Sequence, residues 1–76
     1  MSKPIEPCYG ALGLRVRMIR ETLGLTQDEL AKRVGLDRTS VVNFESGKQR
    51  ILMHNIPEYA TALGITPKHL LRGIWT

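Results

Sequence analysis

The sequence has little of what marks secreted or membrane proteins. Cys8 is the one cysteine among 76 residues, so no internal disulfide can form and a cross-linked secreted scaffold is excluded. No apolar run reaches the length of a signal-peptide core or a membrane span. We therefore expect a cytoplasmic protein with no membrane partner. Phe and Trp occur once each, but the Ala, Leu, Ile and Val content suffices for one small domain with a modest core.

The residue groups that carry catalysis or bind metals are also missing. Cys8, His54 and His69 do not have the spacing of metal ligands. Cys8 and His54 could form a nucleophilic dyad only if a rigid backbone held them, and Cys8 falls in a segment that is irregular by its composition. The sequence also shows no paired carboxylates of the kind that general acid–base catalysis needs. We expect no enzyme activity, no cofactor, no metal and no small-molecule ligand.

Charge is the first positive feature. Lys and Arg together number 11 against 7 Asp and Glu, which gives a net charge of +4 and a pI near 9.7. This balance is compatible with a polyanionic partner but does not require one. Arg outnumbers Lys seven to four, which favours recognition of phosphates and base edges slightly.

Start and stop signals divide the chain into helices. Thr26 with Glu29 matches a capping box, Asp37 is a good N-cap, and Thr66 precedes a proline at the first helical position. Glycines that follow apolar segments of helical period are typical C-terminal stops. They are Gly24, Gly35, Gly47, Gly64 and Gly73.

These signals predict an all-α domain and no strand. The predicted helices cover residues 11–23, 26–34, 37–46, 55–63 and 66–72. Residues 1–10, with Pro4, Pro7 and Gly10, are predicted to form an irregular arm before a domain at 11–76. The apolar stripes of the first, second and fourth helices are Leu12, Val16, Ile19 and Leu23; Leu30, Ala31 and Val34; and Ile56, Tyr59, Ala60 and Leu63.

The second and third helices are separated by a very short break. The second ends at Gly35 and the third begins about three residues later, so the third helix must turn sharply across the second. Ala31 falls where the two helices would cross, and Leu36 is the apolar residue of the turn. This spacing predicts a helix-turn-helix unit.

The outward face of residues 37–46 has the chemistry of a DNA-reading helix. Val41 and Phe44 share the inner side, whereas Arg38, Thr39, Val42 and Asn43 share the outer one. Arg can pair with two acceptors of guanine, Asn with adenine, and an exposed Val with a thymine methyl group. The simpler alternative is a solvated face, although Thr, Val and Asn are weaker helix formers than the residues usual on such faces.

Other residues are candidates for contacts with the DNA backbone. Gln27 lies in the first turn of the second helix, where backbone amides and the helix dipole favour phosphate. Ser40 lies within the third helix. Lys48, Gln49 and Arg50 follow the third helix and could contact the adjacent strand. Lys48 and Arg50 could equally be solubilising surface charges.

Residues Leu12 to Leu71 resemble the Cro and phage-repressor type of helix-turn-helix domain. LGLRVRMIRETLGLTQDELAKRVGLDRTSVVNFESGK is similar to its first three helices and IPEYATALGITPKHLL to its last two, and LTQxxLAxxxG with ExGK is quite specific. The resemblance implies a compact, lambda-repressor-like five-helix bundle that binds operator DNA as a symmetric dimer. It makes Arg38, Thr39 and Asn43 base readers, with Gln27 in support, and it suggests an ion pair between Arg20 and Glu45.

The chain departs from the family pattern after the third helix. Ile51 and Leu52 replace a proline and a polar N-cap that the family often has. An apolar loop there could serve a dimer, whose contact must lie away from the third helix if two half-sites are to be read. The expected interface consists of Ile51, Leu52, Met53, Ile74 and Trp75. Alternatively, Trp75 folds back and caps its own core.

Two functions remain open. The first is a transcriptional regulator, most simply a repressor, that binds a palindromic double-stranded operator as a homodimer. A small phage or plasmid repressor or a restriction–modification controller would fit. The alternative is an antitoxin that binds a toxin protein and represses its own operon. RNA polymerase is a further possible partner of a regulator.

Overall fold

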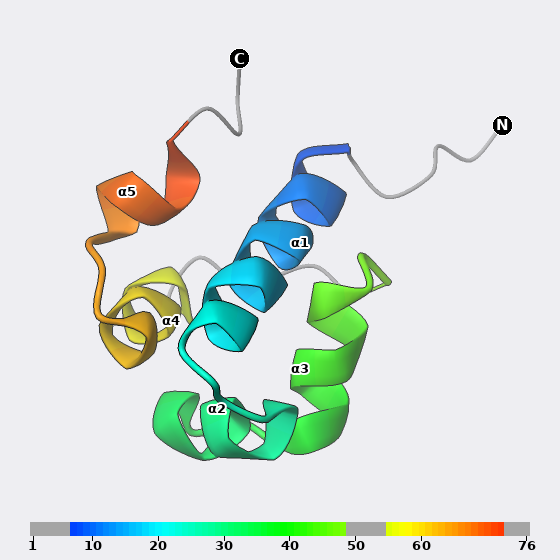
Figure 1. Cartoon of the computed structure of the whole chain (residues 1–76). Coiled ribbons are helices and arrows are strands. Elements are labelled where there is room, and N and C mark those ends of the chain that lie inside the picture. Colours follow the sequence, from blue (N-terminus) through cyan, green and yellow to red (C-terminus); the bar gives the residue numbers. More distant parts are fainter. Residues whose placement is uncertain (1–6, 49–54, 73–76) are drawn as a thin grey trace, which may run out of the picture.

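The computed structural model describes residues 7–48 and 55–72, and these residues form five helices and no strand (Figure 1). Their bounds are α1 (Pro7–Thr22), α2 (Gln27–Val34), α3 (Arg38–Glu45), α4 (Ile56–Leu63) and α5 (Pro67–Leu71). The predicted all-α class and the number of helices are confirmed for this part of the chain. None of these helices is long and apolar enough to cross a membrane.

Helix α1 is the central element of the bundle. Figure 1 shows α3 on one side of it and α4 and α5 on the other, and α1 packs against all three. Helix α2 lies across one end and packs against α3 and α4. Arg33 adds a hydrogen bond of 3.4 Å from its guanidinium to the Ala62 carbonyl, which connects α2 to α4. The result places α3 on the opposite side of α1 from α5.

The core is built largely from the predicted stripes. Its buried apolar members are Leu12, Val16, Leu30, Ala31, Val34, Val41, Phe44, Ile56, Tyr59, Ala60, Leu63 and Leu70. The expectation that Leu23 completes the stripe of the first helix is wrong, because its side chain is 51% exposed. Helix α1 ends at Thr22 and Gly24 takes a left-handed φ of 74°. The Leu23 N–H still bonds the Ile19 carbonyl at 3.0 Å, so the chain turns only at Gly24, and Leu23 lies exposed at the last turn of the helix.

The first helix begins earlier than predicted. Residues 7–10, placed in an irregular arm at 1–10, belong to α1. A proline at the first helical position, as Pro7 is here, removes an N–H that would have no partner inside the helix, so it starts a helix as readily as it breaks one. Gly10 is helical too, since a single glycine weakens a helix by only about 1 kcal/mol. Residues 1–6 lie outside the described part.

The predicted caps of α2 and α3 are present. Thr26 Oγ1 accepts the Glu29 N–H at 3.0 Å, and the Glu29 carboxylate accepts the Thr26 N–H at 2.9 Å, which completes the capping box. Asp37 Oδ1 accepts the Ser40 N–H at 2.7 Å. The backbone hydrogen bond from Ser40 holds the pKa of Asp37 below its usual value. The starts of the two helices that form the helix-turn-helix unit are thus fixed by local side chains.

Candidate nucleic-acid interface

The connection between α2 and α3 is a tight turn. Gly35 has a φ of 76°, and both its N–H and that of Leu36 bond to the Ala31 carbonyl, the latter at 2.9 Å. A left-handed residue after a helix is the geometry that glycine adopts without strain. Ala31 is buried and Leu36 packs partly against the core. Helices α2 and α3 pack against each other, and Ala31 is one of the three buried residues of α2.

Helix α3 has an inner and an outer face. Val41 and Phe44 are buried, and the Phe44 ring packs against Tyr59 with centroids 5.0 Å apart. On the outer face Arg38 and Thr39 are exposed, while Val42 and Asn43 are partly buried. Within the described residues no hydrogen bond engages the side chain of Arg38, Thr39 or Asn43. Within this part of the chain, their donors and acceptors are not used.

The acidic residue of α3 points inward. Glu45 is 6% exposed and accepts two bonds from Arg20, which is 8% exposed. Arg20 Nε lies 2.7 Å from Glu45 Oε2, and the second contact, Nη2 to Oε1, is 3.0 Å. A third donor, Arg20 Nη1, reaches the Leu25 carbonyl at 2.7 Å. The hydrogen bond with Glu45 raises the pKa of Arg20. The suggested ion pair exists, and it keeps a carboxylate away from the outer face of α3.

Gln27 has a partner that the sequence did not reveal. Its Nε2 donates to Glu45 Oε1 at 3.2 Å, so the side chain at the start of α2 lies against the end of α3. The separation of 18 residues gives this bond no local sequence signal. The Gln27 side chain is therefore held in one orientation by α3.

Tyr59 lies beneath the same network. Burial, and secondarily the negative charge of Glu45, raise the pKa of Tyr59 to about 12. The ring therefore stays neutral and packs beneath the inner face of α3. Tyr59 was predicted only as a member of the stripe of the fourth helix, and its contact with α3 is a tertiary feature.

The remaining predicted site residues fall into two groups. Ser40 is partly buried and Lys48 is exposed, directly after the left-handed Gly47. The other predicted site residues lie outside the described part; they are Gln49, Arg50, Ile51, Leu52, Met53, Ile74 and Trp75. His54 lies outside it too. The described part contains no cluster of three His, Cys, Asp or Glu side chains that could hold a metal ion.

The turn at Gly35, the packing of α2 against α3 and the outward face of α3 define a helix-turn-helix domain. A family model described as helix-turn-helix (HTH_3) matches residues 16–70. The chain therefore belongs to the helix-turn-helix family of DNA-binding transcription regulators, of the Cro and phage-repressor type, as the resemblance implied.

Named relatives fit this assignment. A hypothetical transcription factor of Neisseria meningitidis is 40% identical over 60 residues; the match covers 79% of this chain, which spans 57% of that protein's length. The restriction–modification controller protein C.AhdI from Aeromonas hydrophila has a similar structure. Its TM-score is 0.78 at 40% identity, and the match covers 82% of this chain and 94% of C.AhdI. The P22 c2 repressor, in a complex with synthetic operator, gives a TM-score of 0.74 at 29% identity, with 82% and 94% covered.

Proposed function

We propose that this chain is a sequence-specific transcriptional regulator that reads double-stranded operator DNA with α3. The observation that carries the proposal is the outer face of α3. Arg38 and Thr39 are exposed there, and Asn43 is partly exposed. Within the described residues, none of these three side chains forms a hydrogen bond. These side chains have the donors and acceptors that base edges in the major groove require.

Electrostatics supports the same face. A carboxylate on the outer side of a reading helix would repel phosphates, and Glu45, the acidic residue of α3, is buried beneath Arg20. Lys48 is exposed just beyond the helix. The net charge of +4 adds a general attraction to DNA. In this proposal Gln27, Ser40 and Lys48, with Gln49 and Arg50, contact the DNA backbone and set the position of α3.

The test begins with selection of bound sequences from a random DNA pool. Affinity of the wild type for the selected site is then compared with that of Arg38→Ala and Arg33→Ala. Both variants lose one positive charge, but Arg33 lies on the α4 side of α2. Arg38→Ala is expected to lose about 1–3 kcal/mol and to relax the preference at one base pair. Equal losses for the two variants, or equal losses on selected and random DNA, would contradict base reading by α3.

We further propose that the chain binds a palindromic site as a homodimer and represses transcription from it. Two half-sites nearly double the specific energy available to so small a domain, and two copies of α3 must then lie about 34 Å apart. Ile51, Leu52, Met53, Ile74 and Trp75 are proposed as the contact. Sedimentation of Ile51→Asp and Trp75→Ala tests it, with circular dichroism to confirm folding. Folded variants that stay dimeric would rule out this contact.

The direction of regulation needs a separate experiment. A reporter gene whose promoter contains the selected site should be expressed less when the protein is present, because a bound dimer blocks the promoter. Increased expression would make the protein an activator. The relatives named above are regulators, a controller and a repressor, so an antitoxin role and partners such as a toxin or RNA polymerase gain no support from them.

A further inference from the structure

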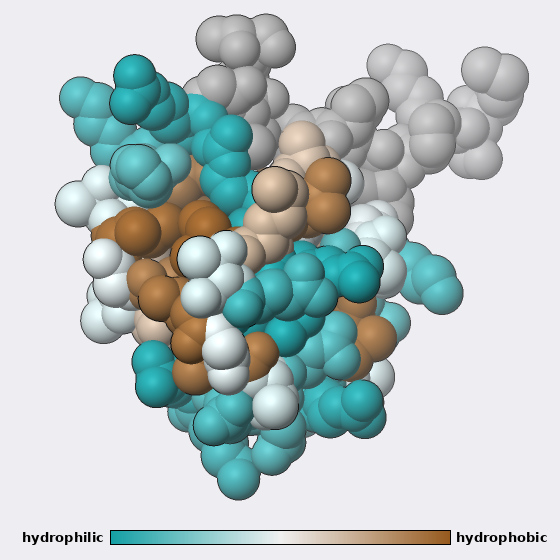
Figure 2. Space-filling view, in the orientation of Figure 1, coloured by the Kyte–Doolittle hydropathy of each residue, from teal (hydrophilic) through white to brown (hydrophobic). Residues whose placement is uncertain are grey.

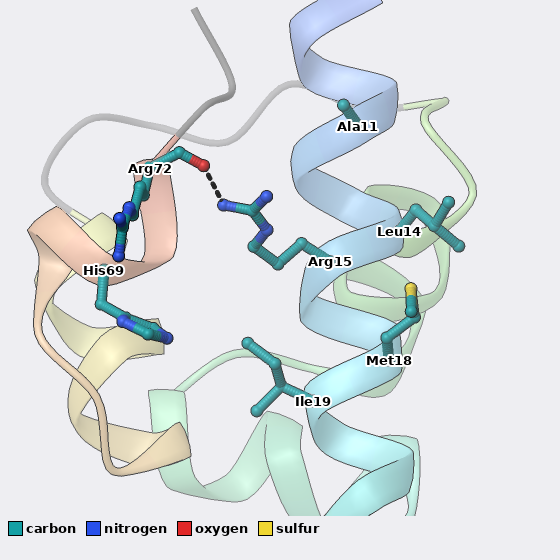
Figure 3. A pocket seen from close by; sticks show the side chains of 7 residues that line it. All are labelled: Ala11, Leu14, Arg15, Met18, Ile19, His69 and Arg72. Carbon is teal, nitrogen blue, oxygen red and sulfur yellow. Dashed lines mark hydrogen bonds between the residues drawn. The ribbon is translucent and has the colours of Figure 1, made fainter.

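An apolar hollow lies between α1 and α5, on the side of α1 away from α3. It has a volume of about 710 Å³. Figure 3 shows Ile19 and Arg15 of α1 extending toward α5, and Leu14 and Met18 along the other margin. We call this surface the α1–α5 groove. Its lining residues are Ala11, Leu14, Arg15, Met18, Ile19, His69 and Arg72.

The apolar side chains of the groove are exposed and lie side by side on one helix. Leu14 and Met18 are 52% and 59% exposed, although large apolar side chains usually join the core. They are four residues apart on α1, and Ala11 extends the same row by three residues, so they share one helix face. Figure 2 shows apolar side chains gathered on this face of the molecule. Neither the packed core nor the outer face of α3 accounts for this row.

The margin of the groove is positively charged. Arg15 and Arg72 line it, and a second hollow of about 730 Å³ shares His69 and Arg72 and adds Lys68. No Asp or Glu lines either hollow among the described residues. Arg15 is fixed in place, because its guanidinium donates to the Leu70 carbonyl at 3.2 Å and also to that of Arg72. These carbonyls are neutral acceptors, so the positive charge of Arg15 remains.

We propose that the α1–α5 groove docks an acidic amphipathic helix of a partner protein. A row of apolar side chains on that helix would cover Ala11, Leu14 and Met18, and carboxylates flanking the row would meet Arg15, Lys68 and Arg72. Recognition by apolar anchors at helical spacing with complementary flanking charge is an established way to bind a helix. DNA fits poorly, because an apolar floor offers nothing to phosphates.

A second copy of this chain is also disfavoured as the occupant. A two-fold contact through the groove would place two copies of the positive margin, Arg15, Lys68 and Arg72, in one interface. Like charges placed together without a compensating carboxylate disfavour such an interface. The same positive margin favours an acidic segment, so the charge pattern favours an acidic partner helix over a second copy of this chain.

A direct test uses two synthetic peptides of about 14 residues, which is about four turns of helix. Both have the same Leu and Ala row, but one has Glu on its flanks and the other has Lys. Titration into isotope-labelled full-length protein, followed by amide chemical shifts, should show binding of the Glu peptide with shifts concentrated in α1 and α5. Comparable binding of the Lys peptide, or shifts centred on α3, would overturn the proposal.

Matched variants locate the contact. Met18→Glu should weaken binding of the Glu peptide about tenfold or more, since it places a charge on the apolar row and repels the peptide. Leu23→Glu introduces the same charge at a similarly exposed position outside the groove and should leave the affinity unchanged. Circular dichroism and DNA binding confirm that both variants fold. Equal affinities of the two variants would contradict docking at the groove.

Two observations on the free protein would also contradict it. Nuclear Overhauser effects between Trp75 and Met18 would show that the chain's own C-terminal residues fill the groove. Dimerisation that Met18→Glu abolishes would assign the groove to a second copy. If the groove is unoccupied in the free protein and the Glu peptide does not change DNA binding, the results support a partner site separate from the DNA-reading face.

Discussion

Gly13 of α1 lies directly against the carbonyl oxygen of Phe44 in α3, and a Cβ atom at residue 13 would overlap that oxygen. The same Cβ would come within 3.2 Å of the Glu45 Cα atom. Backbone lies against backbone at this point, so no flexible side chain can move aside. The closeness of the two helices, and hence the position of the outer face of α3, depends on a residue without a side chain.

Gly13→Ala should therefore destabilise the fold. Overpacking typically costs about 1–3 kcal/mol, and the better helix propensity of alanine returns only about 0.5–1 kcal/mol. Gly10→Ala is the matched control, because it lies in the same helix with open space around the added atom. Thermal unfolding should show a lower Tm for Gly13→Ala and an unchanged or higher Tm for Gly10→Ala. The reverse order would show that α1 and α3 separate without cost.

The buried pair of Arg20 and Glu45 should be important for stability. Removal of one partner from a buried ion pair leaves an uncompensated charge and can cost about 3–5 kcal/mol. Arg20→Ala and Glu45→Ala are both expected to lower the free energy of unfolding markedly in urea denaturation. Arg17→Ala is the control, since Arg17 and Glu21 form an exposed pair on the same helix, and such pairs contribute about 0–1 kcal/mol. Similar unfolding curves for all three variants would refute the prediction.

Asp37 should make stability depend on pH in the acid range. The Ser40 N–H bond lowers the folded-state pKa of Asp37 below its ordinary 3.8. A lowered pKa stabilises the fold above the unfolded value, and this stabilisation disappears as the pH falls through the folded value. Tm measured between neutral pH and pH 2 should fall less steeply for Asp37→Asn, which keeps a neutral cap, than for the wild type. Asp37→Ala should melt lower even at neutral pH. Parallel curves for the wild type and Asp37→Asn would exclude this role.

Lys48 should contribute affinity without specificity. A lysine that contacts phosphate releases counterions on binding, so Lys48→Ala should weaken selected and random DNA alike. The slope of log affinity against log salt should become shallower by about 1. Fluorescence anisotropy at several salt concentrations measures both quantities. A loss confined to the selected site, with an unchanged slope, would assign Lys48 to base recognition.

Local signals in the sequence were enough to predict the helix-turn-helix unit. Side chains at Thr26, Glu29 and Asp37 act within three residues of their backbone partners, so caps can be recognised without tertiary structure. Leu23 was misplaced because an apolar period does not show whether the last residue before a turn, here the turn at Gly24, is covered by the core. The α1 start was misplaced because Pro7 is equally suited to a loop and to a first helical turn.

Long-range contacts account for what was missed. Apolar periodicity is read from side chains, and glycine has none, so the close contact of Gly13 with Phe44 could not be predicted from the sequence. The bond from Gln27 to Glu45 joins residues 18 apart through their side chains, and no spacing rule predicts it. Arg20 with Glu45 was suggested because a family resemblance supplied the pairing. The α1–α5 groove arises from packing of elements far apart in the chain.

The side chains that hold α3 in place and those on its outer face are different residues. Phe44, Val41 and Glu45 anchor the helix, whereas Arg38 and Thr39 form no hydrogen bond through their side chains within the described residues. Exposed substitutions of that kind usually change stability by less than about 0.5 kcal/mol. The outer residues can thus be exchanged while the domain folds as before. If α3 reads DNA as proposed, DNA preference can diverge with almost no loss of folding stability.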